Sequence, residues 1–280
     1  MKGCFFSEGQ LIFSGGGKLR VTGNYKHGIC SYDYVRFRQG SRVTVVGAVK
    51  DGIHVNDAVV IGGGILNITA TDDGIQCEKG PISVTGGRTT VITTGNAVYE
   101  DSDISSSSCI NSGTTFAMTA GTVLLKSSGS AGKGLNCDGE IYLYGGTLRV
   151  VTTGKQYVYG RLDSSAKGIK SKSSLTIESG TIWVRATGGE GSEGIESKNV
   201  MTINGGDIAV YAYDDCLNAS NNITINGGSV YCYSTGNDGV DSNGTLTITG
   251  GTVVASGTAS PEDGFDCDQN TFKITGGTVL

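Results

Sequence analysis

One degenerate repeat of 22 to 26 residues runs through the chain and constrains its fold more than any other feature. Each copy opens with Gly or Cys, then an apolar residue, any residue and usually a small residue. Two intervals are longer, 34 and 35 residues, so two copies carry insertions. The opening motif begins at Cys4, Gly28, Gly52, Gly74, Cys109, Gly134, Gly168, Gly194, Cys216, Gly239 and Gly264.

Two further motifs follow within each copy. The second is apolar, any, apolar, any, Gly-Gly, and it is clearest over residues 201–206, 223–228 and 246–251. The third alternates again, as in Thr147-Leu148-Arg149-Val150. Period-two alternation between Gly or Asn turns predicts three short strands per copy, and no window shows a useful helical period.

Such a strand triplet cannot bury its apolar side alone, whereas stacked copies create a continuous core. We therefore predict an all-β, right-handed parallel β-helix of about eleven coils, with residues 1–280 as a single domain. Neither end carries a cap, which suggests a segment of a longer protein. The insertions, residues 93–108 and 152–166, both precede an opening motif and should leave the same edge. One inward ladder is predicted at Ile29, Ile53, Ile75, Ile110, Leu135 and Ile169.

Composition removes several function classes. The 47 Gly have no period of three, and the apolar fraction of 37% argues against collagen and against disorder. A net charge of −5 argues against nucleic acid as a partner, and no apolar run is long enough for membrane insertion. Cys77, Cys137 and Cys267 share a repeat position with Ser, Ala and Val, so buried thiols are favoured over a disulfide framework.

Acidic residues recur at two neighbouring outward positions of the last coils, the turn before the opening motif and the third residue of that motif. Stacked carboxylates repel one another, and Ca²⁺ relieves this because it prefers several oxygen ligands. We therefore predict Ca²⁺ between coils, and a smaller site near the other end at Asp51 and Asp73. The alternative is that these are hydrated turn-forming residues. The main predicted ligands are Asp215, Asp238, Asp241, Asp263 and Asp266.

The middle coils carry lysines at the same edge, and the insertions add aromatic residues beside them. A basic strip could hold a polyanionic sugar, and tyrosines on a rigid solenoid could stack on pyranose rings. Solubilising charge and decorative loops are the alternatives. His27 and His54 alone give a zinc site or a histidine-based triad little to work with. The predicted ligand-binding residues are Lys133, Lys167, Lys170, Lys172, Tyr99, Tyr157, Tyr159 and Arg161.

Several stretches resemble a bacterial carbohydrate-binding β-helix family first described in a cellulolytic clostridium. They are residues 213–220 with 223–228, residues 236–245 and residues 262–268, together with residues 8–15 and 24–27. The resemblance implies an extracellular or cell-surface protein that binds plant-wall polysaccharides with the help of Ca²⁺. It also implies kinship with family 9 pectate lyases, which use a lysine base, although no lysine here matches theirs by motif.

Three functions follow as hypotheses. The leading one is non-catalytic binding of a polysaccharide such as polygalacturonate or cellulose, by a monomer. A Ca²⁺-dependent lyase of the pectate type is the second, so enzymatic activity is left open. The third is a structural or adhesive surface solenoid without a glycan ligand.

Overall fold

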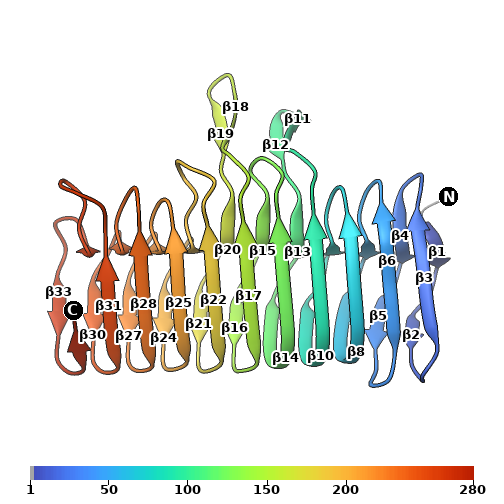
Figure 1. The fold of residues 1–280 in the computed structure, drawn as a ribbon, viewed down its shortest axis with the longest axis horizontal. Coiled ribbons are helices and arrows are strands. Elements are labelled where there is room, and N and C mark those ends of the chain that lie inside the picture. The colour runs from blue at the N-terminus through green and yellow to red at the C-terminus, as the bar shows by residue number, and fades with distance from the viewer. Residues whose placement is uncertain (1–2) are drawn as a thin grey trace.

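A computed structural model describes residues 3–280 and shows a solenoid made of β-strands. Eleven coils lie side by side along the long axis, with the two ends of the chain at opposite ends (Figure 1). The strands facing the viewer run upward while successive coils step from right to left, so the winding is right-handed. Residues 3–280 contain no helix of the length and apolarity that crossing a membrane requires.

Three parallel sheets run the length of the solenoid, and each coil contributes to all of them. The first, sheet 1, is formed by the opening motifs. Its strands are β1 (Gly3–Ser7), β4 (His27–Ser31), β7 (Ile53–Val55), β9 (Ile75–Cys77), β13 (Ser108–Ser112), β15 (Lys133–Cys137), β20 (Lys167–Ser171), β23 (Ile195–Ser197), β26 (Leu217–Ala219), β29 (Val240–Ser242) and β32 (Phe265–Asp266).

The second and third motifs form sheets 2 and 3. Sheet 2 contains β2 (Leu11–Phe13), β5 (Tyr34–Phe37), β8 (Ala58–Ala70), β10 (Ile82–Thr93), β14 (Phe116–Ser127), β16 (Ile141–Leu143), β21 (Leu175–Ile177), β24 (Met201–Ile203), β27 (Ile223–Ile225), β30 (Leu246–Ile248) and β33 (Phe272–Ile274). Sheet 3 contains β3 (Lys18–Gly23), β6 (Arg42–Ala48), the second halves of β8, β10 and β14, then β17 (Thr147–Thr152), β22 (Thr181–Ala186), β25 (Asp207–Ala212), β28 (Ser229–Ser234), β31 (Thr252–Ser256) and β34 (Thr278–Val279).

The prediction of three strands per coil is confirmed except where β8, β10 and β14 each bend through two sheets as one strand. The Gly-Gly pair forms the corner between sheets 2 and 3. Its second glycine has a positive φ, for example 89° at Gly228, where an added Cβ would lie 2.7 Å from the carbonyl oxygen of Gly206. A side chain is thus excluded by both conformation and space.

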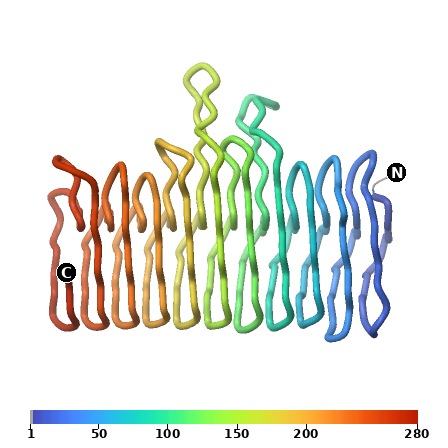
Figure 2. Tube along the Cα trace, in the orientation of Figure 1, coloured from blue at the N-terminus to red at the C-terminus, as the bar shows by residue number. Residues whose placement is uncertain are grey.

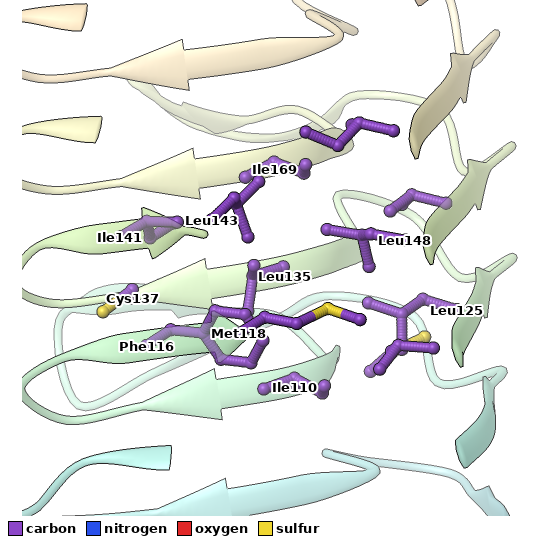
Figure 3. Packing of buried hydrophobic residues seen from close by; sticks show 14 of the residues in the cluster. Ile110, Phe116, Met118, Leu125, Leu135, Cys137, Ile141, Leu143, Leu148 and Ile169 are labelled. Atoms are coloured by element: carbon purple, nitrogen blue, oxygen red, sulfur yellow. The ribbon is translucent and has the colours of Figure 1, made fainter. Parts of the chain in front are cut away.

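The core is a stack of ladders along the axis. The predicted ladder from Ile29 to Ile169 is confirmed, because its members pair in register and are fully buried. Figure 3 shows part of it, with Ile110, Leu135 and Ile169 stacked and Met118 and Leu148 packed across from them. All eight cysteines lie in the described range and are thiols; of the three at the shared repeat position, Cys77 and Cys137 are buried as predicted, whereas Cys267 is half-buried.

Both insertions form antiparallel hairpins that leave the same edge, as predicted (Figures 1 and 2). One hairpin pairs β11 (Val98–Glu100) with β12 (Asp103–Ser105), and the other pairs β18 (Tyr157–Tyr159) with β19 (Leu162–Ser164). Tyr99 and Tyr159 stack on each other with ring centroids 4.0 Å apart, which ties the two hairpins together.

Candidate functional site

Two columns of residues run along the edge where sheet 1 begins. The column of turn residues, predicted to be outward, is largely buried, with Asp51, Asp73 and Asp215 each at most 5% exposed. The turn column is formed by the residue before each opening motif, and the outward column by the third residue of that motif. Sheet pairing and backbone hydrogen bonds hold both in register. The turn column is His27, Asp51, Asp73, Ser108, Lys133, Lys167, Glu193, Asp215, Asp238 and Asp263. The outward column is Cys30, His54, Gln76, Asn111, Asn136, Lys170, Glu196, Asn218, Asp241 and Asp266.

Turn-column aspartates bind the backbone of the next coil. The amide N–H of Asp238 donates to Asp215 Oδ1 at 3.1 Å, and that of Asp263 donates to Asp238 Oδ1 at 2.6 Å. The same contact recurs at the other end, where Asp51 Oδ1 and Asp73 Oδ1 accept from the next coil at 3.2 and 2.6 Å. These aspartates therefore have a structural role in stacking, whatever else they bind.

Asparagines of the outward column link two of the turn-column carboxylates to neighbouring groups. Asn218 Nδ2 donates to Asp215 Oδ2 at 3.0 Å and to Asp241 Oδ2 at 2.8 Å, so it bridges two coils. Asn111 Nδ2 donates to Asp73 Oδ2 at 2.8 Å. Burial raises the pKa of Asp215 to about 8, with Asp214 and Asp241 adding repulsion, and burial also raises the pKa of Asp73 well above its usual range.

Four predicted Ca²⁺ ligands, Asp238, Asp241, Asp263 and Asp266, make no ion pair with lysine or arginine within residues 3–280, and of these only Asp241 accepts from Asn218. Burial, together with the charges of Asp238 and Asp266, raises the pKa of Asp241 to about 7. These donors are all oxygens, which suits a hard cation. Their ligand atoms are not gathered within 4.8 Å of one another, so a shared ion would require side-chain rotation.

The predicted basic strip is largely ion-paired in the structure. Lys167 Nζ lies 2.7 Å from Glu193 Oε1, and Lys170 Nζ lies 3.1 Å from Glu196 Oε2. Glu196 is 1% exposed and also pairs with Lys198. The more exposed Lys172 pairs with Asp138 at 2.7 Å.

Lys133 differs from the other lysines because its contacts are neutral. Its Nζ donates to Ser106 Oγ at 2.6 Å and to the carbonyl oxygen of Ala131 at 3.1 Å, and it lies 3.5 Å from Ser164 Oγ. Ser106 and Ser164 belong to the bases of the two hairpins. Burial lowers the pKa of Lys133 to about 8, and repulsion from Lys170 and Lys167 contributes.

Both histidines of the chain meet around Asp51. His54 Nδ1 lies 2.7 Å and His27 Nδ1 lies 3.1 Å from Asp51 Oδ2, and the two rings stack with centroids 4.3 Å apart. Burial alone would raise the pKa of Asp51, but the two imidazoles outweigh it and lower the pKa. Burial alone would lower the pKa of His54, but Asp51 and Glu78 outweigh it and raise the pKa.

A surface cavity of about 640 Å³ opens beside these histidines. Its wall includes Lys26 and Lys50 as well as Gln76, Glu78 and Asp72. The expectation that two histidines offer too few partners for a metal site is therefore incomplete. Stacking places the turn residue of one coil beside the outward residue of the next coil. The signal in the sequence was the 24-residue interval between the two opening motifs that they flank.

The predicted hairpin residues lie together at the same edge. One face of Tyr99 and one of Tyr159 are covered by their mutual stacking, while Arg161 is exposed at the hairpin turn and Tyr157 is half-buried. They are separated from the C-terminal acidic residues by several coils (Figure 1).

A second outward surface, not anticipated from the sequence, lies on sheet 3. We call it the aromatic strip, and it consists of Arg149, Trp183, Arg185, Tyr211, Tyr231 and Tyr233. The Trp183 and Tyr211 rings are 6.1 Å apart and the Tyr211 and Tyr231 rings 5.6 Å apart, and Arg149 Cζ lies 4.3 Å from the Trp183 ring centre. The alternation of the third motif was the available signal, since each member occupies an outward position.

Two shallow grooves continue this surface along the axis. One, of about 330 Å³, lies between Trp183, Tyr211 and Tyr233. The other, of about 290 Å³, runs from Thr90 over Leu124 to Arg149. Together they extend across six successive strands, a length of about 24 Å at the usual strand spacing.

The fold places the chain in the class of parallel β-solenoid repeat proteins. The family model described as "Carbohydrate-binding domain-containing protein" matches residues 1–153 and 153–239. The chain therefore belongs to this carbohydrate-binding family, and its partner is a carbohydrate. The searches of curated proteins and of solved structures found no match to it.

Proposed function

We propose that the protein binds a polysaccharide without cleaving it, and that the aromatic strip is the surface that holds the chain of sugars. The observation that carries this proposal is the run of Trp183, Tyr211 and Tyr231 in three successive coils, whose rings alternate between two outward positions of sheet 3 and lie 6.1 and 5.6 Å apart. Flat aromatic faces offer large apolar area with a polar edge, which suits a sugar ring that is apolar on one side and hydroxylated around its rim. The regular stacking of coils repeats such faces along one direction, as a polymer requires.

We further propose that the ligand is an acidic plant cell-wall polysaccharide such as polygalacturonate. Arg149 and Arg185 lie at the same end of the aromatic strip, on a protein whose net charge is −5. A guanidinium binds a carboxylate through two parallel hydrogen bonds. Because such polymers are found outside the cell, we propose an extracellular or cell-surface location. We also propose that the protein acts as a monomer.

Ca²⁺ is part of this proposal, at the C-terminal end of the two edge columns. Asp238, Asp241, Asp263 and Asp266 would hold it, since their mutual repulsion is not compensated by a cationic side chain among the described residues. A bound Ca²⁺ supplies positive charge that can both join coils and attract uronate carboxylates.

Affinity electrophoresis in gels containing polygalacturonate, together with a cellulose pull-down, tests the binding surface. Trp183→Ala should weaken retention about 30-fold, the usual effect of removing a central aromatic anchor worth about 2 kcal/mol. Tyr25→Ala is the matched control, because Tyr25 is 85% exposed and distant from the aromatic strip in sequence and coil.

Retention of neither polymer would refute the proposal that the chain binds plant cell-wall polysaccharides of these kinds. Retention that survives Trp183→Ala and Tyr231→Ala but is lost in Tyr157→Ala or Arg161→Ala would place the ligand on the hairpins instead. Loss of polygalacturonate retention on adding a chelator, with cellulose unaffected, is the expected signature of Ca²⁺.

One observation favours a second candidate, a lyase acting on acidic polysaccharides. The pKa of Lys133, lowered to about 8 by burial and by neighbouring lysines, gives it a neutral fraction that a general base needs. Release of unsaturated uronides by the protein with Ca²⁺, lost in Lys133→Ala and retained in Lys172→Ala, would establish it. The absence of such products across pH would leave non-catalytic binding as the function.

A further inference from the structure

The cluster of His27, Asp51 and His54 has the chemistry of a transition-metal site. It is the one group within residues 3–280 in which three ligand-type atoms of His, Cys, Asp or Glu lie within 4.8 Å of one another. His27 is the first residue of β4, Asp51 forms the turn of the next coil, and His54 is the outward residue of β7 three positions later. Two rigid coils therefore fix all three donors.

His27 is a buried residue whose Nδ1 has only a poorly aligned contact. It is 3% exposed, and its Nδ1 makes no aligned hydrogen bond although Asp51 Oδ2 is 3.1 Å away. A buried polar nitrogen with no hydrogen bond weakens the fold, so its persistence needs an explanation. His27 Nδ1 and His54 Nδ1 both approach Asp51 Oδ2, which indicates that one atom is bound among these three.

The surroundings of His54 indicate that this atom carries positive charge. Its Nε2 lies 3.1 Å from Glu78 Oε1, an arrangement in which the carboxylate holds the Nε2–H and leaves the Nδ1 lone pair available. That lone pair then faces two oxygens, Asp51 Oδ2 at 2.7 Å and Gln76 Oε1 at 3.0 Å. A proton on His54 Nδ1 also satisfies these oxygens, but it leaves His27 Nδ1 without a hydrogen bond, whereas a metal ion would bind both imidazoles.

The separations fit a metal of the zinc class. Two ligands held at about 2.0–2.1 Å in a tetrahedron are about 3.3 Å apart. To reach that separation, the observed 2.7 and 3.1 Å contacts to Asp51 Oδ2 would open by about 0.6 and about 0.2 Å. Two imidazoles with one carboxylate favour zinc or a similar ion over Ca²⁺, which prefers oxygen ligands throughout.

We propose that His27 Nδ1, Asp51 Oδ2 and His54 Nδ1 bind one divalent transition-metal ion, with Glu78 orienting His54. The fourth coordination position faces the cavity lined by Gln76 and Lys50, so the ion is accessible to solvent and to a small ligand. The site is distinct in place and chemistry from the C-terminal carboxylates, and it is independent of the proposed glycan surface on sheet 3.

Calorimetric titration of the whole chain with Zn²⁺ tests the proposal, with nitrogen NMR of the imidazoles as a second readout. The chain contains two histidines, so their signals report on this site alone. We expect one Zn²⁺ per chain and a shift of both Nδ1 resonances. His54→Ala should weaken binding at least 100-fold, and Glu78→Gln, which removes only the orienting charge, about 10- to 100-fold.

Two control variants address other zinc ligands. Cys4→Ser removes the exposed thiol, and Asp241→Asn alters the acidic edge at the other end; both should bind Zn²⁺ as the parent chain does. His54 is the chosen test residue because its side chain is partly exposed and its replacement leaves the core intact.

Three outcomes would overturn the proposal. The first is no saturable Zn²⁺ binding, and the second is Zn²⁺ binding that is unchanged in His54→Ala. The third is that Ca²⁺ displaces Zn²⁺ as effectively as Zn²⁺ itself and shifts both imidazole signals. None of these measurements involves a carbohydrate, so failure here and failure of the polysaccharide proposal are separable.

Discussion

The carboxylates at the C-terminal edge make the stability of the metal-free protein fall as the pH rises. Burial, together with the charges of Asp238 and Asp266, raises the pKa of Asp241 from 3.8 to about 7. A carboxyl with a raised pKa binds its proton more tightly in the folded chain than in the unfolded chain. Its stabilising effect is therefore complete below about pH 4 and is lost as the pH rises to about 7.

The size of the effect follows from the same pKa. A carboxyl whose pKa rises from 3.8 to about 7 costs the folded state at most about 4 kcal/mol once ionised. Asp241 is partly exposed, so screening by water reduces the expected cost to about 1–2 kcal/mol. For a chain of this size that corresponds to a decrease in Tm of about 2–8 °C.

Thermal unfolding followed by circular dichroism, with chelator present, measures this directly. The Tm of the parent chain should be lower at about pH 8 than at about pH 5. Asp241→Asn keeps an oxygen that accepts from Asn218 and removes the charge, so its Tm should exceed that of the parent at the higher pH. Asp207→Asn, at an exposed position of β25, is the matched control and should not alter the pH dependence.

A Tm that is flat or rises over this pH range would refute the reasoning, as would an Asp241→Asn variant with the parent's pH dependence. Addition of Ca²⁺ at the higher pH should restore the Tm of the parent but not that of Asp241→Asn. That last comparison separates simple repulsion from cation binding.

Three further predictions concern the solenoid itself. Glu196→Gln should lower the free energy of unfolding by about 3–5 kcal/mol in chemical denaturation, because it leaves Lys170 and Lys198 without their buried partner. Lys172→Ala, at a surface pair, should change it by less than about 1 kcal/mol. Gly228→Ala should lower the Tm through its positive φ and the 2.7 Å approach to Gly206, whereas Gly16→Ala, with open space around it, should not. Ile169→Ala should cost about 2–5 kcal/mol, and an unfolding free energy close to that of the parent would contradict its place in the core ladder.

The coil architecture could be predicted because the information lies in local sequence and repeats. Each opening motif places one apolar residue inward, and the Gly-Gly pair marks each corner, so the ladder through Ile29 and Ile169 follows from counting. The joining of two strands into one at β8, β10 and β14 could not be predicted, since it depends on how a glycine corner bends rather than on a residue pattern.

The candidate sites were less accessible, because they depend on which side chains meet between coils. Lys167 and Lys170 resemble a basic strip in the sequence, but the next coil supplies Glu193 and Glu196 at the matching positions. His54 seemed isolated until stacking placed it against His27. The register of the repeat was known, yet the direction of each side chain was not.

Stacking also explains the order of charges along the edge. Identical coils would place like charges about 5 Å apart along the whole length, and each coil can avoid this only by changing its own residue. The structure contains three such solutions: histidines around Asp51, lysine–glutamate pairs in the middle coils, and Asn218 between Asp215 and Asp241. From Asp238 to Asp266 no cationic partner follows among the described residues, although the same geometry applies. Once Asp241 loses its proton at higher pH, an external cation is the remaining way to relieve that repulsion, which is why we assign the proposed Ca²⁺ to these coils and a different metal to the histidines.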